Sequence, residues 1–292
     1  YDFSNINSYN GSGNTVNDLS IGGNNGVVLG DSSQIYFDSN ENAFFFNESN
    51  GDHGIAIQNH NYVSGASDQI ENLTLSAKIK LPNSTSNRQR IILSYDRSTV
   101  FRFAIGSDGS NTDSAAGKIA FMFTNSTGIK DKYDAGYSGD LRDNQWHDVM
   151  VKFEANKSGG LKYYVDGVLT YTDPDTYPPI SNQDTNETPR FGIIGNGSEM
   201  TSVNGSRTPT DPFSGWIKSI KFSENKLIIP QDTLPPTVIL TKNKDNFSFK
   251  HTDVINITAQ FSEAMTPTPI LNISGVASNV LMDATSSTSV WT

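Results

Sequence analysis

The chain has 292 residues, no cysteine and a formal net charge of −10, and charged residues make up only 18% of it. Nucleic acids and anionic membranes bind basic surfaces, so this charge argues against both classes of partner. The absence of cysteine excludes disulfide bonds and thiolate metal sites. No apolar run approaches the roughly 18 residues of a membrane span. A start at Tyr1 rather than Met predicts a processed precursor or an excised piece.

Many short strands are predicted in the first part of the chain, because apolar or alternating runs are separated by loops rich in Gly, Asn, Ser and Asp. In chain order the runs read GVVLG, QIYF, NAFFFN, GIAIQ, LTLSAKIKL, RIILSY, FRFAI and KIAFMF. The fifth run alternates Leu73, Leu75 and Ala77 with polar residues, as a half-buried strand does. No convincing helix interrupts the runs, so they predict two stacked antiparallel sheets.

Residues 145–172, which read QWHDVMVKFEANKSGGLKYYVDGVLTYT, predict a meander of three antiparallel strands. Asp166-Gly167 predicts the turn between the last two strands, because a type I′ turn needs positive φ at both central positions. His147 falls on the apolar face of the first strand. We therefore interpret His147 as a core histidine hydrogen-bonded to backbone rather than a catalytic base, and Asp166 as a turn residue. RFGIIG and GWIKSIKF then predict two further strands.

A break in the pattern follows at IIPQDTLPPTVILT, where prolines flank a short polar segment. We predict a linker over residues 229–236 and a second domain over residues 237–292. DVINITAQFSEAM alternates as a clear strand, and PILNIS and VLMDA predict its successors. A seven-stranded immunoglobulin-like sandwich takes about 100 residues. The second domain is shorter, so we expect a partial one whose parent protein continues.

Four motifs, in this order, resemble the laminin-G-like, concanavalin-A-like jelly roll. They are the Trp-His strand WHDVMVKFE, the strand LKYYVDG, the strand end FGIIGNG and the closing strand FSGWIKSIKF. The opening SYNGSGNTVNDLSIGGNNGVVL also resembles the start of bacterial members. The resemblance covers residues 1–228 and implies a two-sheet antiparallel jelly-roll sandwich. The tail resembles bacterial immunoglobulin-like repeats, which are strung in arrays on large surface adhesins and imply a stalk.

This fold family includes glycan-binding lectins, protein-binding modules, pentraxins and glycoside hydrolases, so the fold does not give the function. Its retaining hydrolases carry the order Glu-x-Asp-x-(x)-Glu on one strand face, with the two glutamate carboxyl groups about 5 Å apart. No Glu of this sequence has an Asp two positions later. We therefore expect a non-catalytic module and keep a divergent glycoside hydrolase as a remote alternative.

Calcium is the one cofactor that the resemblance implies, since pentraxin-like and some laminin-G-like relatives hold it at the sandwich rim with several oxygen ligands. Their ligand loops follow a Ser-Tyr strand and the Ile-x-Gly strand, and here these loops read LSYDRSTV and IIGNGSEM. The implied ligands are Asp96, Asn196 and Glu199. Arg97 beside Asp96 departs from the pattern. A further oxygen-rich segment, residues 107–114, lacks EF-hand spacing, and we interpret it as turns.

Glycan binding would use exposed aromatic rings that stack on sugar faces, together with Asp or Asn side chains for the hydroxyl groups. Two predicted loops, DKYDAGYSGD and YTDPDTYPP, supply both kinds of residue. The candidate ligand-binding residues are Tyr133, Asp134, Tyr137, Asp173, Asp175 and Tyr177. Trp146 and Trp216 begin or sit within strands, and we interpret them as core residues.

The sequence thus predicts an all-β chain, with a jelly-roll sandwich and a partial immunoglobulin-like β-sandwich. We expect a non-catalytic extracellular adhesion module, at the bacterial cell surface or secreted, that binds glycan or another cell-surface ligand through rim loops. Further immunoglobulin-like repeats would carry it, and neither nucleic acid nor direct membrane insertion is expected. The alternative is a structural or protein–protein contact domain with no small-molecule ligand.

Overall fold

The computed structural model describes residues 1–47, 53–62, 68–83, 90–96, 100–106, 115–183, 189–197, 212–228, 237–243, 256–261, 270–273, 277–283 and 290–291. The chain divides into two compact units, Tyr1–Pro230 and Gln231–Thr292. Every named element within these ranges is a β-strand, which confirms the all-β prediction. None of the described residues forms a helix that is long and apolar enough to span a membrane.

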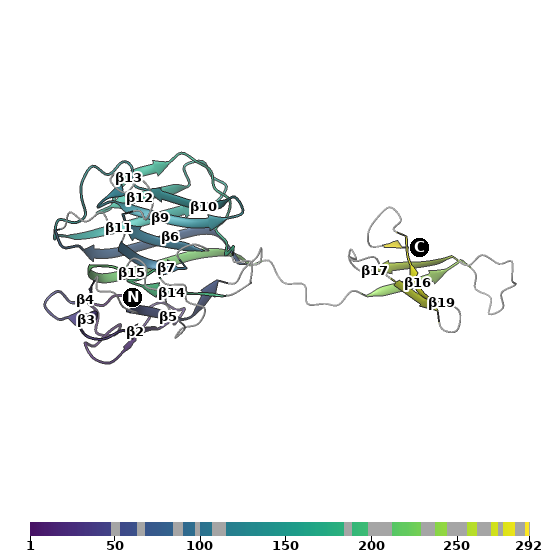
Figure 1. Ribbon diagram of the computed structural model, residues 1–292, viewed down its shortest axis with the longest axis horizontal. Coiled ribbons are helices and arrows are strands. Elements are labelled where there is room, and N and C mark those ends of the chain that lie inside the picture. The colour runs from purple at the N-terminus through teal and green to yellow at the C-terminus, as the bar shows by residue number, and fades with distance from the viewer. Residues whose placement is uncertain are drawn as a thin grey trace. The chain divides into compact units, whose positions relative to one another are not determined.

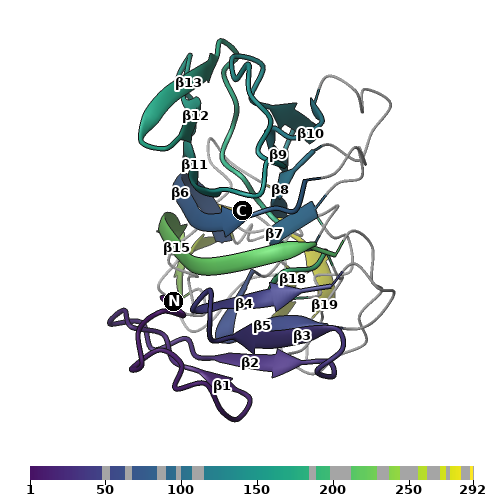
Figure 2. The same cartoon turned by 90° about the vertical axis from the view of Figure 1, so that its left-hand side faces the viewer.

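The first unit contains two large antiparallel sheets, seen as two layers in Figures 1 and 2. The eight-stranded sheet has the order β1-β2-β5-β14-β7-β8-β9-β10. Its strands are β1 (Thr15–Val16), β2 (Gly26–Leu29), β5 (Gly54–Tyr62), β14 (Arg190–Ile194), β7 (Arg90–Tyr95), β8 (Phe101–Ile105), β9 (Ile119–Asn125) and β10 (Gly128–Tyr133).

The seven-stranded sheet has the order β13-β12-β11-β6-β15-β4-β3, and Figure 2 shows β13, β12, β11, β6 and β15 following one another in one layer. Its strands are β13 (Val168–Asp173), β12 (Leu161–Val165), β11 (Trp146–Glu154), β6 (Asp68–Lys80), β15 (Gly215–Ile228), β4 (Ala43–Phe46) and β3 (Ile35–Asp38). The predicted meander is therefore confirmed as β11, β12 and β13, which pair in succession.

The core lies between these two sheets, and one apolar cluster includes side chains from both. The alternation predicted for β6 is confirmed, since Leu73, Leu75 and Ala77 are at most 4% exposed. Phenylalanine supplies many of the largest fully buried side chains: Phe3, Phe44, Phe46, Phe101, Phe103, Phe121, Phe123 and Phe213. The seven-stranded sheet buries one face and leaves partly exposed residues on the other, as β11 shows. In the eight-stranded sheet, β7, β8 and β9 are buried at every position.

The turn between β12 and β13 forms as predicted. Asp166 and Gly167 have φ values of 50° and 79°, so both central positions are left-handed, as a type I′ turn requires. The Asp166 carboxylate also accepts a hydrogen bond of 2.8 Å from the backbone N–H of Asp148 on β11. This contact fixes the turn against the neighbouring strand.

The N-terminal residues complete the seven-stranded sheet along β15. The Tyr1 amino group donates to the Ile220 carbonyl at 2.8 Å, and the N–H groups of Ile220 and Phe3 donate to the carbonyls of Tyr1 and Lys218, both at 2.9 Å. These contacts continue the edge that β4 begins at Gly215–Ile217. Beyond Ile220, β15 pairs only with β6 within the described part of the chain.

The second unit contains two small antiparallel sheets. One has the order β16-β17-β20, and the other pairs β18 with β19. The strands are β16 (Val238–Lys242), β17 (Ile257–Phe261), β20 (Val290–Trp291), β18 (Ile270–Ile273) and β19 (Ala277–Leu281). Strands therefore occur at the three predicted runs, while the immunoglobulin-like assignment stays a prediction.

Candidate functional site

Five side chains lie in one row across the outer face of the seven-stranded sheet. In the strand register, Tyr36 faces Phe45, Phe45 faces Trp216, and Trp216 faces Lys80. On the far side of β6, Lys80 faces Trp146. The row therefore crosses β3, β4, β15, β6 and β11 at a right angle to the strands, and we call these five residues the aromatic row.

The rings of the aromatic row contact one another and are covered by lysines. Ring centroids lie 5.2 Å apart for Tyr36 and Phe45, and 4.8 Å apart for Phe45 and Trp216. The Lys80 ammonium lies 5.1 Å from the centroid of Trp216. Tyr36 is 41% exposed, and the other members of the row are half-buried. The prediction that both tryptophans are core residues is wrong, because they lie on the outer face of the sheet.

Two carboxylates from the end of β3 and the loop after it hold the indole rings in place. Trp216 Nε1 donates to Asp38 at 3.0 Å, and Trp146 Nε1 donates to Glu41 at 3.1 Å. Glu41 also accepts a hydrogen bond of 2.8 Å from Lys80. The tryptophans are thus oriented by hydrogen bonds as well as by packing, and the row is preorganised.

Both of these carboxyl groups have pKa values below their usual range. Burial raises the pKa of Asp38, but hydrogen bonds from Trp216 and from two backbone N–H groups outweigh it and lower that pKa. The hydrogen bond from Lys80 is the main reason why the pKa of Glu41 is lowered. Asp38 and Glu41 are therefore anions at neutral pH.

Two hollows continue from the row along the same outer face, over β6, β11, β12 and β15. Tyr164 lines both of them. The hollow nearer the row has a volume of about 230 Å³ and is lined by Ser76, Lys78, Asp148, Met150, Ser219 and Lys221 among others. The farther hollow, of about 360 Å³, is lined by Asn72, Thr74, Lys152, Glu154, Lys162 and Ser223 among others.

Lysines gather on this face, although the chain as a whole has a net charge of −10. They are Lys78, Lys80, Lys152, Lys162, Lys218 and Lys221. Lys218 lies 4.3 Å from the centroid of the Trp146 ring, and Lys152 lies 5.3 Å from that of Tyr164. Neither of these two ammonium groups forms a salt bridge to a carboxylate among the described residues. The face therefore offers aromatic surfaces next to positive charges that an anionic ligand could engage.

A model of laminin-G type, described as the concanavalin A-like lectin/glucanases superfamily, matches residues 49–227. The chain belongs to this superfamily. The match includes β6, β11 and β15, which carry three of the five positions of the aromatic row. No curated protein matches this concanavalin A-like chain at a significant level.

Several solved structures resemble the chain at low identity. Domain 4 of AbnA, an extracellular GH43 arabinanase from Geobacillus stearothermophilus solved with arabinotriose, is 15% identical over 77% of this chain and 91% of its own, with a TM-score of 0.41. The binding domain of Paraclostridial Mosquitocidal Protein 1 is 13% identical over 72% of this chain, with a TM-score of 0.43. The binding domain of Botulinum Neurotoxin DC, in complex with SialylT, is 16% identical over 73%, with a TM-score of 0.45. This chain covers 45% and 46% of those two toxin chains.

The concanavalin A-like sandwich brings the two predicted glycan loops together, but three of the six candidate side chains are buried. Asp134, Asp173 and Tyr177 are each at most 5% exposed. Asp134 accepts a hydrogen bond from Thr170 of β13, and the Tyr177 hydroxyl donates to Asp173 at 3.0 Å. The prediction that these three side chains are exposed is therefore wrong. These side chains fix the loops to the sandwich.

The other members of that predicted set are more accessible. Tyr133 does not lie in a loop as predicted; it is the last residue of β10, half-buried, and Lys118 lies 5.9 Å from its ring centroid. Tyr137 is half-buried against the core. Asp175 is exposed and pairs with Lys132 at 3.0 Å. A role of this cluster in glycan binding stays a prediction.

The structure does not bring the predicted calcium ligands Asp96 and Asn196 together. In the register of β7 and β14, Asp96 follows the end of one strand and Asn196 follows the end of its antiparallel partner, so roughly 16 Å of strand separates them. Asp96 is buried and forms a salt bridge with Arg190, whose Nε lies 2.7 Å from the carboxylate. Asn196 is buried and donates to the His53 carbonyl at 2.9 Å. Glu199 lies outside the described residues.

Metal ligands do not cluster elsewhere either: the described ranges contain no group of three or more His, Cys, Asp or Glu side chains that could hold an ion. The oxygen-rich segment at residues 107–114 lies outside those ranges. Calcium binding by this chain therefore stays a prediction.

His147 is not bonded to backbone as predicted; it lies between two carboxylates at the start of β11. Its Nδ1 is 2.8 Å from Asp166 and its Nε2 is 3.2 Å from Asp143. Burial lowers the pKa of His147, but the hydrogen bonds to Asp166 and Asp143 outweigh it and raise that pKa. The side chain is 12% exposed. With both ring nitrogens engaged, it braces the turn after β12 and has no free nitrogen for proton transfer.

Proposed function

We propose that this chain is a non-catalytic glycan-binding module and that the aromatic row is its binding surface. The observation that supports this proposal is the direct register of Tyr36, Phe45, Trp216 and Trp146 across the sheet. A pyranose ring has an apolar face of C–H groups that packs on an aromatic ring. Successive sugars could then lie along the row and reach the two hollows beside it.

The glycan that fits this surface best carries negative charge. Lys152 and Lys218 cover aromatic rings and form no salt bridge to a carboxylate within the described residues. A uronate, sialate or sulfate group could draw these ammonium groups aside and expose the rings. A neutral sugar would have to displace the two ammonium groups without forming an ion pair with them. We therefore propose that acidic glycans bind more tightly than neutral ones of the same length.

The charge state of the carboxylates supports a binding rather than a hydrolytic role. Glycoside hydrolysis by paired carboxylates needs one protonated acid near neutral pH. Asp38 and Glu41, beside the tryptophans, have lowered pKa values instead. Both carboxyl groups would therefore be deprotonated at the pH at which such an acid must still carry its proton.

The wider setting in this proposal follows the sequence. The module would act outside the cell, at a bacterial surface or secreted, on immunoglobulin-like repeats of a large adhesin. Calcium binding at the rim stays part of this proposal. A rise in melting temperature at millimolar calcium, reversed by chelator, would support that part; no shift would refute it.

A glycan array of neutral, uronate-containing, sialylated and sulfated sugars tests the proposed function. Trp216→Leu keeps an apolar side chain against Phe45 and removes the indole. Tyr133→Leu is the matched control, since it removes an aromatic ring from the predicted loop cluster. We expect Trp216→Leu to weaken binding about tenfold, or roughly 1.4 kcal/mol, and Tyr133→Leu to bind as the parent does.

Other results of the same experiment would point elsewhere. Loss of binding in Tyr133→Leu alone would place the site at the loop cluster. Equal binding of neutral and acidic sugars, with no dependence on salt, would refute the role of the lysines. If no glycan binds, the structural or protein–protein contact function becomes the better explanation. Release of reducing ends from any polysaccharide would overturn the non-catalytic proposal.

A further inference from the structure

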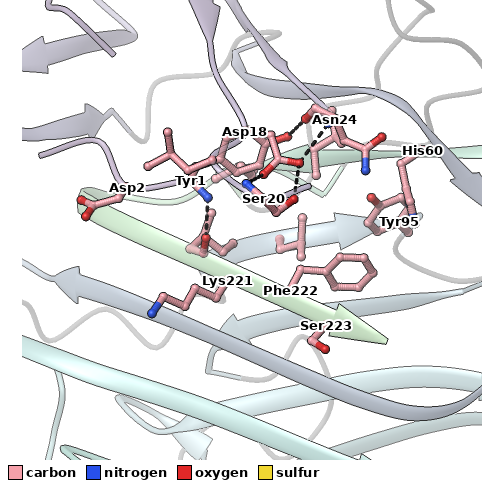
Figure 3. Close-up of a pocket in the computed structure, with 15 residues that line it drawn as sticks. Tyr1, Asp2, Asp18, Ser20, Asn24, His60, Tyr95, Lys221, Phe222 and Ser223 are labelled. Carbon is pink, nitrogen blue, oxygen red and sulfur yellow. Dashed lines mark hydrogen bonds between the residues drawn. The ribbon is translucent and has the colours of Figure 1, made fainter. Parts of the chain in front are cut away.

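A separate cavity opens between the two sheets, on the inner side of β15. Its volume is about 530 Å³, within the range of roughly 300–1,000 Å³ that is common for small-molecule sites. Figure 3 shows Lys221, Phe222 and Ser223 along one strand at its edge, and Tyr95 and His60 beside it. The apolar part of its wall consists of Leu19, Ile57, Leu93, Ile194, Ile220 and Phe222.

The cavity lies beside the part of β15 that follows its pairing with the N-terminal residues. The N-terminal residues pair with β15 only as far as Ile220. From Lys221 onward, β15 pairs with β6 alone within the described ranges. The interior next to Phe222 is therefore not covered by a neighbouring strand on that edge.

Two buried polar atoms on the cavity wall have no hydrogen-bond partner within the part of the chain that the structure describes. One is the hydroxyl oxygen of Tyr95, a residue that is 0% exposed, and the other is Nδ1 of His60. Buried hydroxyl groups are nearly always hydrogen-bonded, because leaving one unpaired is costly. Such a pair of unsatisfied atoms in one cavity indicates that a ligand supplies the missing partners.

The Tyr95 ring is fixed in place, so its hydroxyl cannot turn to another acceptor. A Cβ at Gly192 would lie 2.5 Å from Tyr95 Cζ, which means that only glycine lets the ring lie there. Tyr95 also contacts the rings of Tyr62 and Phe222, with centroids 4.8 Å and 5.9 Å away. The hydroxyl group is thus held at the cavity by packing on several sides.

The His60 ring is oriented by a half-buried carboxylate. His60 Nε2 lies 3.0 Å from Glu224, which also accepts a hydrogen bond from the Tyr62 hydroxyl. A carboxylate accepts hydrogen bonds and does not donate them, so Nε2 carries a hydrogen; in the tautomer with that hydrogen alone, Nδ1 is an acceptor. The cavity therefore presents one hydroxyl group and one acceptor nitrogen beside its apolar wall. The rest of its lining includes the polar residues Asp2, Asp18, Ser20, Asn24, Lys221 and Ser223.

We propose that this cavity binds a small uncharged molecule with a flat apolar body and one hydroxyl group. The ligand's hydroxyl would pair with the Tyr95 hydroxyl and His60 Nδ1, and its body would pack against Phe222 and the aliphatic wall. A charged ligand is disfavoured beside Tyr95 and His60, because burying a charge against the apolar wall is costly, although Asp2, Asp18 and Lys221 also line the cavity. The site is distinct from the aromatic row and does not depend on glycan binding there.

Titration of the whole chain with 2-naphthol tests this proposal, with naphthalene and 2-naphthoate as the ligands that lack the hydroxyl and that carry a charge. Ligand fluorescence and saturation-transfer NMR report binding. The variant is Tyr95→Phe, which removes one oxygen and keeps the ring. The matched control is Tyr163→Phe, because Tyr163 is equally buried and also has an unpartnered hydroxyl, but does not line the cavity.

We expect saturable binding of 2-naphthol with a submillimolar Kd, a loss of about five- to tenfold in Tyr95→Phe and no change in Tyr163→Phe. Naphthalene should bind the parent and Tyr95→Phe equally, and 2-naphthoate more weakly than 2-naphthol. The proposal is overturned if 2-naphthol does not bind, if both variants lose affinity equally, or if 2-naphthoate binds most tightly. Circular dichroism melting confirms that each variant is folded.

Discussion

The histidine at the start of β11 makes the stability of the first unit depend on pH. His147 Nδ1 lies 2.8 Å from Asp166, whose carboxylate also accepts from the Asp148 N–H. Asp166→Asn removes the negative charge while keeping an oxygen acceptor and a residue type that tolerates a φ of 50°. The substitution therefore tests the effect of the Asp166 charge without changing the geometry of the turn.

The magnitude follows from the exposure of the two partners. The side chain of His147 is 12% exposed, but that of Asp166 is 52% exposed, so water screens the pair. We expect Asp166→Asn to lower the free energy of unfolding by about 1 kcal/mol where His147 is protonated. Asp143, at 3.2 Å from the other ring nitrogen, would keep part of the interaction in the variant.

The two pKa shifts determine how the difference in unfolding free energy between the parent and the variant changes with pH. The pKa of His147 is raised in the folded chain, so its contribution is complete below about pH 6.5 and is lost as pH rises through the folded pKa. Burial raises the pKa of Asp166, but hydrogen bonds from His147 and Asp148 lower it overall. Its contribution is therefore present above about pH 4 and is lost as pH falls through the folded pKa. The variant should differ most from the parent between these limits.

Urea unfolding of the parent and Asp166→Asn at pH 5.5 and pH 9 measures the effect, and NMR titration of the His147 ring gives its pKa directly. We expect the difference in unfolding free energy to be largest at pH 5.5 and to shrink at pH 9. The pKa of His147 should fall in the variant. An equal difference at both pH values, with an unchanged histidine pKa, would show that the turn geometry matters and the charge does not.

Three further substitutions have predicted effects on urea unfolding. Gly192→Ala should destabilise the first unit by about 2 kcal/mol, since the new Cβ would meet the Tyr95 ring at 2.5 Å; an unchanged midpoint would contradict the fixed ring. Tyr163→Phe should stabilise it by about 1 kcal/mol, because it removes a buried hydroxyl without a partner; a loss of stability would mean that the hydroxyl is satisfied. Asp96→Asn should cost about 3 kcal/mol by weakening the buried pair with Arg190, and a neutral effect would exclude that pairing.

Much of the sandwich could be predicted because its inward positions follow a period of two. The run at β6 and the meander with its Asp166-Gly167 turn carry local signals that tertiary structure does not override. The sequence does not predict β10, because GIKDKY has few apolar residues and no clear alternation. A strand at the edge of a sheet can be polar on both faces. Tyr133 was therefore placed in a loop.

The aromatic row could be predicted only in part. The alternation of β11 places Trp146 on the same face as Asp148 and Met150, which is the outer face, so the local signal for its exposure was present. What the sequence could not supply was the register that puts Trp216 opposite Lys80. These two strands are far apart in the chain, and pairing between distant strands leaves no local pattern.

The sequence predicts Asp96 and Asn196 at one rim because it does not show which strands pair with one another. Each of Asp96 and Asn196 follows an apolar strand, and both were expected at one rim. Because β7 and β14 are antiparallel neighbours, residues that follow each of them must lie at opposite ends of the pair. Knowing which strands are adjacent would have separated the two positions at once.

The pairing of Tyr1 with Ile220 determines how the first unit would respond to mechanical load. Residues 1–3 pair antiparallel with β15, the last strand of the first unit, so Tyr1 and the end of β15 lie toward the same side of this pair. A force that pulls these ends apart would open the hydrogen bonds one after another rather than load them all at once. Such a module would yield at its N-terminal edge first, while the sheet that carries the tryptophans on its central strands stays intact.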